Sequence, residues 1–256
     1  NGQGADELLA GYPRYYPTYL RQLLLTGRWP SFVRNFEGFR RQQGGLSRAA
    51  LLRDLATPFW PDWLRRGARL AGRGQAYDDR FLAPALRSMR DPDAEALARR
   101  AFNSLDRHLR SDLTATRLPE LLQAEDRFSM AFSIESRVPF LDRRFVEFAL
   151  ALPAHEKIES GTTKVVMRKA MRGLLPDITV DRRDKQGYPT PGDTWLRQHG
   201  AEYAGDLLAS RSFRERGVFD PAATDAAFAQ WRAGNGKLPG LWTWLSTEIW
   251  FRRYLD

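Results

Sequence analysis

The stretch LPELLQAEDRFSMAFSIESRVPFLDRRFVEFALALP (118–153) decides the fold class of this chain. Its first part, 118–135, spaces apolar residues as on one side of a helix and leads to a bend at 136–140. Its second part, 142–153, predicts a helix that Asp142 caps and Pro153 ends. Helical spacing on both sides of the bend, without strand-like alternation, predicts a mainly α protein.

Segments outside this stretch repeat the helical pattern. Residues 5–27 predict a short helix, a break at Pro13 and Pro17, and a second helix ending near Gly27. Further helices are predicted within 31–56, divided at Gly44-Gly45, at 93–113, at 162–176 with Thr162 as cap and Pro176 as stop, and at 238–256, with Leu241, Trp242, Leu245 and Ile249 near one face. Residues 57–93 are the least regular. The chain shows no internal repeat and no linker that forces two domains.

Composition excludes several classes of protein. The 256 residues are 43% hydrophobic and 12% aromatic, which is enough to build a globular core. The absence of cysteine excludes disulfides, zinc–thiolate sites and cysteine nucleophiles within this chain. No apolar run approaches the roughly 20 residues of a spanning helix, and no signal-peptide layout is present, so we predict a cytoplasmic protein without a membrane partner.

The net charge of +9 raises the question of nucleic acid. The basic residues are scattered and interleaved with acids, as in LRRGARLAGRGQAYDDR (64–80), which is typical of a solvated face. We therefore predict no nucleic-acid partner and keep a basic helical nucleic-acid-binding protein as the alternative from a different class. Only five of the 40 basic residues are lysines, so each lysine position is open to a specific role.

The opening loop NGQGADE (1–7) is the first candidate site. Gly2 and Gly4 leave backbone amides exposed at a helix N-terminus, where phosphates bind readily. Asp6 and Glu7 could hold Mg²⁺ beside such a phosphate. The loop lacks the third glycine of a dinucleotide fingerprint and the GK[ST] of a Walker loop. The plainer alternative is that acids in a first helical turn only complement the helix dipole.

Two further segments concentrate charge. Glu135 and Arg137 lie two residues apart at the predicted bend, where a salt bridge is the plain interpretation. Lys164 lies near a helix start, where the dipole disfavours a cation, so a reason other than helix stability could hold it there. Lys185 lies in a loop with Gly187 and Pro189, and both lysines could also be solvated surface charges.

Taken together, these segments resemble the asparagine synthetase family. NGQGADELLAGY resembles that family's second nucleotide-site loop, usually SGEGSDE or TGQGADE followed by GGY. LLQAEDRFSMAFSIESRVPFLD closely matches its specific DR-x-SMA-x-S-x-E-x-R-x-PFLD stretch. TTKVVMRKAM and RRDKQGYPTP match its K-x-x-LR and K-x-G-F-x-x-P elements. Order and spacing agree over essentially the whole chain.

The resemblance implies a fold and an activity. Residues 1–256 would be a partial asparagine synthetase domain, the helical C-terminal portion of an α/β ATP-pyrophosphatase domain whose parallel sheet lies mostly upstream. The family's glutaminase domain and its SGG-x-DS pyrophosphate loop are not in this sequence, so we expect these residues alone to be inactive. The parent enzyme, a possible homodimer, would use ATP and Mg²⁺ to adenylate the side-chain carboxylate of aspartate. Ammonia from glutamine would then give asparagine, AMP and pyrophosphate.

The resemblance also implies residue roles. In the opening loop, the residues implied to contact ATP are Asn1, Gly2 and Gly4, Gln3 stands where many members have a glutamate linked to intermediate formation, and Asp6 with Glu7 would serve Mg²⁺ and pyrophosphate. Lys164 would stabilise charge on the intermediate or on pyrophosphate, and Lys185 would assist. Glu135, Arg137 and Tyr12 would position the substrate or brace the site.

Three departures from the family pattern stand out. Asn1 replaces a Ser or Thr, Tyr188 replaces a Phe, and Ala10 replaces the first glycine of GGY. The change at Asn1 bears most directly on phosphate geometry. Related members, the β-lactam synthetases and lasso-peptide cyclases, adenylate a carboxylate but use an internal amine. A different carboxylic acid and a different nucleophile, an internal amine in place of ammonia, therefore remain alternatives.

Overall fold

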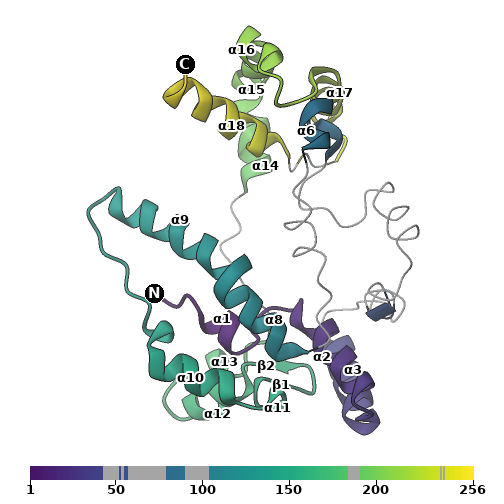
Figure 1. The fold of residues 1–256 in the computed structure, drawn as a ribbon, viewed down its shortest axis with the longest axis vertical. Coiled ribbons are helices and arrows are strands. Elements are labelled where there is room, and N and C mark those ends of the chain that lie inside the picture. Colours follow the sequence, from purple (N-terminus) through teal and green to yellow (C-terminus); the bar gives the residue numbers. More distant parts are fainter. Residues whose placement is uncertain are drawn as a thin grey trace. The chain divides into compact units, whose positions relative to one another are not determined.

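The computed structural model describes residues 1–42, 52, 55–56, 79–89, 104–183, 191–236, 238 and 240–256. The chain divides into two compact units, Asn1–Trp60 with Arg100–Gln186 and Pro61–Arg99 with Gly187–Asp256. Both are helical, and the described residues form one small sheet of two strands (Figure 1). The predicted mainly α class is therefore confirmed. Within the described residues, no helix is long and apolar enough to cross a membrane.

The first unit begins with the predicted short helix and break. Its first helices are α1 (Ala5–Leu8), α2 (Tyr15–Leu25) and α3 (Trp29–Gln42). The break lies around Pro13 alone, because Pro17 falls in the first turn of α2, where no helical partner is lost. The helix predicted after Gly44-Gly45 and residues 93–103 of the helix predicted at 93–113 fall largely outside the described residues, whereas the rest of the second helix is confirmed at Leu105–Ser111.

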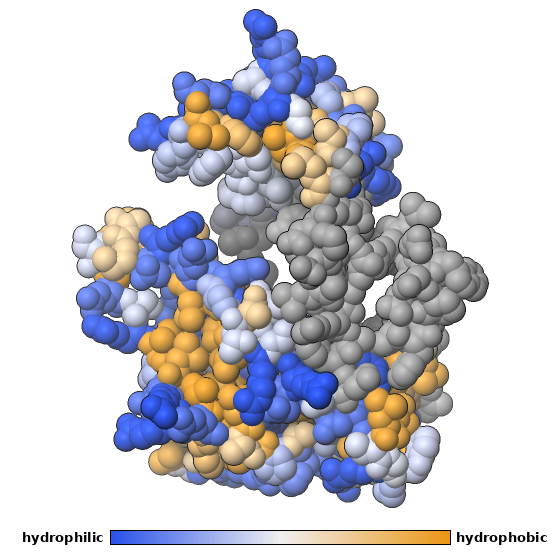
Figure 2. All heavy atoms as spheres, in the orientation of Figure 1, coloured by the Kyte–Doolittle hydropathy of each residue, from blue (hydrophilic) through white to orange (hydrophobic). Residues whose placement is uncertain are grey.

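In the middle of the first unit, the helix predicted over 118–135 is present but ends earlier, at Met130. Its elements are α8 (Leu105–Ser111), the π-helical turn η3 (Asp112–Thr116) and α9 (Leu118–Met130). The predicted helix to residue 135 is wrong at its end, because Ser133 takes a left-handed φ of 57° and the chain then runs without helix to Val138. The exposed apolar side chains along this stretch are Phe128, Met130, Phe132 and Ile134. Figure 2 shows apolar surface on the face of this unit that carries α1, α9 and α10.

The end of the first unit departs from prediction at one helix start. Its elements are η4 (Pro139–Leu141), α10 (Arg143–Ala151), α11 (Ala154–Lys157), β1 (Ile158–Glu159), β2 (Thr162–Thr163), α12 (Val165–Met171) and α13 (Asp177–Val180). The Asp142 cap is confirmed, since its carboxylate accepts a bond from the Arg144 backbone N–H at 3.0 Å. The Thr162 cap is wrong: Thr162 pairs with Glu159 in a hairpin, and α12 begins after Lys164. Gly161, at φ 86°, makes this turn possible.

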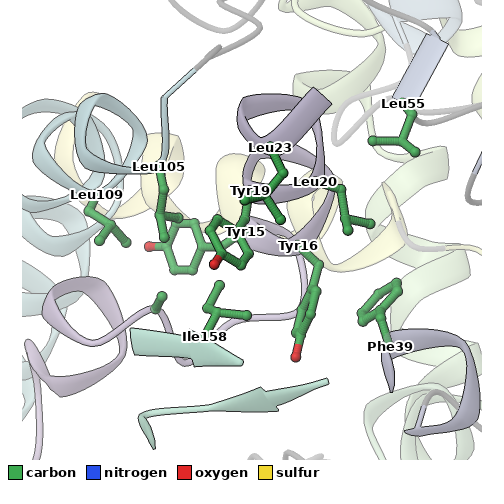
Figure 3. Packing of buried hydrophobic residues seen from close by; sticks show 11 residues of the cluster. Tyr15, Tyr16, Tyr19, Leu20, Leu23, Phe39, Leu55, Leu105, Leu109 and Ile158 are labelled. Atoms are coloured by element: carbon green, nitrogen blue, oxygen red, sulfur yellow. The ribbon is translucent and has the colours of Figure 1, made fainter. Parts of the chain in front are cut away.

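Two clusters of buried side chains hold the first unit together. Tyr15, Tyr16 and Tyr19 of α2 pack with Leu105 and Leu109 of α8, and the cluster also takes in Ile158 and Phe39 (Figure 3). The second cluster contains Leu8, Leu9 and Ala149, with Leu141, Val166 and Met167 packed against it. The second cluster therefore joins α1, η4, α10 and α12, which carry three of the sequence motifs.

The second unit has its own core. Its elements are η2 (Asp79–Phe81), α6 (Pro84–Ser88), α14 (Gly192–Trp195), the π-helical turn η5 (Leu196–Gly200), α15 (Ala201–Ala209), α16 (Arg211–Glu215), α17 (Pro221–Arg232) and α18 (Gly240–Tyr254). The predicted last helix is confirmed, but its buried face carries Leu241, Trp244, Leu245 and Glu248. Trp242 and Ile249, predicted on that face, are 67% and 45% exposed, because they lie about a third of a turn off the buried row. Buried Glu248 accepts bonds from Arg216 and Arg252.

Candidate active site

The opening loop packs directly on the PFLD motif. Gly4 precedes α1 with a φ of 91°, and a Cβ there would lie 2.4 Å from the Leu141 side chain. Asn1 donates through Nδ2 to Ser136 Oγ at 2.5 Å and to Glu125, and its Oδ1 accepts from the Gln3 backbone N–H at 2.9 Å. The structure therefore brings the first and second sequence motifs together.

An ion pair joins the first motif to the third. Lys164 Nζ lies 2.7 Å from Asp6 Oδ1, and neither side chain is more than about a quarter exposed. Lys164 precedes α12 in the left-handed region, at φ 53°, and its backbone N–H donates to the Leu9 carbonyl at 3.3 Å. A non-glycine residue costs energy in this conformation, and such strain gathers at functional sites. Lys164, whose position near a helix start is unusual for a cation, thus forms an ion pair with Asp6.

A cavity of about 710 Å³ opens on this pair within the first unit. Asp6 and Lys164 line it, together with residues from 11–16, 161–163 and 167–183. Three further cations, Arg168, Arg182 and Arg183, also line it, so the wall carries an excess of positive charge. A cavity of this kind suits a ligand that carries several negative charges.

Arg168 supports this wall as well as charging it. Its Nε donates to the Thr163 carbonyl at 2.8 Å and its Nη1 to the Val180 carbonyl, which ties β2 to α13. Burial lowers the pKa of Arg168, and the nearby Arg183 lowers it further. None of the three cavity arginines was predicted from the sequence, because arginine carries most of this chain's positive charge and no single arginine stands out. The position of Arg168 one helical turn after Lys164 was the available signal.

Glu7 and Tyr12 lie apart from the cavity lining. Glu7 is 1% exposed, and Tyr12 donates its hydroxyl to Glu7 Oε1 at 3.0 Å. The Arg117 guanidinium lies 4.5 Å from the centre of the Tyr12 ring. Burial raises the pKa of Tyr12, while its bond with Arg117 opposes the rise. Buried Glu7 and half-buried Tyr12 and Arg117 thus form a cluster beside the start of the chain. The roles predicted for Glu7 in Mg²⁺ binding and for Tyr12 in substrate binding stay predictions.

The other predicted residues separate into two groups. Glu135 and Arg137 form an ion pair with each other and are mostly exposed, and neither they nor Gln3 are among the described residues that line the cavity. They lie instead beside Asn1, which bonds to Ser136. Lys185 lies outside the described residues. The structure brings Asp6 and Lys164 together and leaves the roles of the remaining residues as predictions.

Of the cavity-lining residues that the structure describes, Asp6 is the one carboxylate that a divalent cation would meet. Among the described residues, no group of three or more His, Asp or Glu side chains is placed to hold a metal. Mg²⁺ commonly binds through one or two carboxylates together with substrate phosphates. Asp6 fits that mode, whereas buried Glu7 faces Tyr12.

The described elements place one carboxylate, one lysine and three arginines around a cavity, a charge pattern that suits an anionic ligand. Residues 1–252 match the family model described as asparagine synthase, so the chain belongs to the asparagine synthase family. The predicted family resemblance is confirmed.

Relatives at modest identity carry the same description. Asparagine synthetase [glutamine-hydrolyzing] 1 of Bacillus subtilis is 27% identical over 223 residues, which cover 81% of this chain and 33% of that protein. A putative asparagine synthetase [glutamine-hydrolyzing] of Mycobacterium tuberculosis is 29% identical over 284 residues, covering 100% of this chain and 39% of that protein. The chain thus spans between a third and two fifths of the length of these curated relatives. No solved structure matches it.

Proposed function

We propose that this chain forms the helical part of the ATP-pyrophosphatase domain of an asparagine synthetase. The reaction would join ATP to the side-chain carboxylate of aspartate, and ammonia derived from glutamine would then displace AMP to give asparagine. Family membership and the relatives described as glutamine-hydrolyzing asparagine synthetases support this assignment. The observation that carries it is the Asp6–Lys164 pair on a cationic cavity of about 710 Å³.

The cavity residues suit the charge that such a reaction develops. Adenylation makes AMP the leaving group of a carboxylate, and it releases pyrophosphate, whose negative charge must be neutralised. Lys164 is placed to exchange its contact with Asp6 for a phosphate oxygen, and Arg168 adds positive charge one helical turn away. Mg²⁺, when held by Asp6 and the substrate phosphates, would supply further charge neutralisation.

The test is aspartate-dependent release of pyrophosphate from ATP by the complete protein that contains this chain. We expect release with aspartate, asparagine formation with glutamine, and a loss of roughly 100-fold or more in kcat for Lys164→Ala. Release with a different carboxylic acid would keep the adenylation chemistry and shift the assignment to the β-lactam or lasso-peptide type. Absence of release with every acid tested would contradict the proposal.

A further inference from the structure

Residue 11 lies where the two partners of the Asp6–Lys164 pair meet. A Cβ built on Gly11 would lie 1.8 Å from Asp6 Oδ1 and 2.5 Å from Lys164 Cε. Real Cβ atoms essentially never approach other heavy atoms this closely. Gly11 does not have a left-handed φ, unlike Gly4, so its backbone conformation does not itself call for glycine. The requirement at this position is for space.

Two backbone hydrogen bonds hold the segments around Gly11 in place, so a larger residue there would be accommodated by the side chains of Asp6 and Lys164. The Gly11 N–H donates to the Asp6 carbonyl at 2.8 Å, which fixes residue 11 against the start of α1. The Lys164 N–H donates to the Leu9 carbonyl, which fixes the lysine backbone against the same turn. A methyl group at position 11 would therefore have to displace the Asp6 carboxylate, the Lys164 side chain or both. Asp6 has the shorter side chain and the closer contact, so it must move first.

We propose that Gly11 is a positioning residue: its missing side chain keeps open the space in which Asp6 and Lys164 meet at the cavity wall, from which Lys164 binds phosphate and Asp6 binds the accompanying divalent cation. The geometric part stands on the contacts of Gly11 alone. The ligand class, a pyrophosphate bound with a divalent cation, rests on the proposed function. Gly11 touches neither ligand in this scheme and acts through the other two residues.

The experiment is a double-mutant cycle in the complete protein that contains this chain, with Gly11→Ala, Asp6→Ala and the double variant. Inorganic pyrophosphate with Mg²⁺ is titrated by calorimetry, and melting temperatures are measured without ligand. We expect Gly11→Ala to weaken pyrophosphate binding roughly tenfold or more, and to lower the melting temperature by roughly 2 to 8 °C through overpacking. Removing the Asp6 carboxyl removes the 1.8 Å contact and leaves the one with the flexible Lys164 side chain, so Gly11→Ala should cost less stability in the Asp6→Ala background than in wild type.

Two glycines provide matched controls. Gly192 has open space around its Cβ position and no left-handed φ, so Gly192→Ala should change neither binding nor stability. At Gly38 a Cβ would lie 2.3 Å from the Ser160 backbone carbon, so Gly38→Ala should destabilise the chain equally with and without Asp6→Ala. The Gly38→Ala control distinguishes a loss of stability that any steric clash causes from a loss that depends on the Asp6 side chain.

The outcomes are distinct. Wild-type binding by Gly11→Ala, or a loss of stability that is just as large in the Asp6→Ala background, would overturn the proposal. If wild-type protein itself fails to bind pyrophosphate, the proposed function fails. The stability cycle then still decides the role of Gly11, because relief by Asp6→Ala supports it and full additivity contradicts it.

Discussion

Lys157 brings a charge into the interior of the first unit. Lys157 is 2% exposed and is the last residue of α11. The next residue, Ile158, belongs to the buried cluster that contains Tyr15, Tyr16 and Tyr19. Burial lowers the pKa of Lys157 to about 8 from its ordinary value of 10.5, and Asp106 only partly opposes this. Asp106 also accepts a bond from Arg110 at 2.8 Å, so its charge is shared. A buried ammonium with such limited compensation destabilises the fold.

Lys157→Met should therefore stabilise the protein at neutral pH. Between pH 8 and 10.5 the unfolded lysine holds more protons than the folded one, so this residue makes stability rise with pH across that window. The methionine variant should lack that part of the rise and should gain about 1–3 kcal/mol at pH 7, measured by urea unfolding at several pH values. A variant no more stable than wild type at pH 7, with the same pH dependence, would contradict the argument. Lys169→Met, at an exposed lysine of α12, is the control.

Lys164 contributes both an ammonium group and a residue in the left-handed backbone conformation, and two substitutions separate these contributions. Lys164→Ala and Lys164→Gly both remove the ammonium, so both should lose pyrophosphate binding to the same extent. Glycine adopts a φ of 53° without the steric cost that alanine retains. We expect the glycine variant to be more stable than the alanine variant by about 1 kcal/mol in chemical unfolding. Equal stability would mean that the surrounding structure relaxes this conformation.

Among the helices, α10 offers the clearest test of a local signal. Asp142 accepts the Arg144 backbone N–H, and Arg144 and its backbone N–H hold the pKa of the Asp142 carboxyl below its ordinary value. Asp142→Ala should lower stability, whereas Asp142→Asn, which can still accept this bond, should retain most of it. Thermal unfolding of the three proteins checks this. An alanine variant as stable as wild type would show that packing of α10 on the cluster around Ala149 holds the helix without its cap.

The helices were predictable where local chemistry sets their ends, as at Asp142 and Pro153. The prediction of a helix cap at Thr162 was wrong because threonine is a common cap residue. Its place in β2 depends on pairing with Glu159, a contact that helical periodicity does not encode. Lys164 was singled out correctly as an anomaly, but its partner Asp6 lies 158 positions away in sequence and was joined to it only by the family resemblance. Ala10, which replaces a glycine of the family pattern, lies at a left-handed φ of 55°. The sequence alone does not reveal that this position has a conformation that favours glycine.

At the scale of the whole chain, the candidate site belongs to one unit. The cavity, the Asp6–Lys164 pair and the clusters behind them come from the first unit, whereas the core around Trp231 and Trp244 belongs to the second. Ligand binding stabilises the folded state by RT ln(1 + [L]/Kd), about 2.7 kcal/mol at 100 times Kd, against every opening that disrupts the site. A ligand in this cavity should therefore act locally.

Hydrogen exchange followed by mass spectrometry tests this. With Mg²⁺ and inorganic pyrophosphate, we expect slower amide exchange in residues 1–12 and in α12, since these carry Asp6, Lys164 and Arg168. Exchange in α15, α17 and α18 should stay unchanged, because none of their residues lines the cavity. Lys164→Ala should abolish the protection while leaving the ligand-free exchange pattern intact outside α12. Equal protection of both units in wild type would instead mean that the ligand acts on the chain as a whole, and the site would have to be assigned elsewhere.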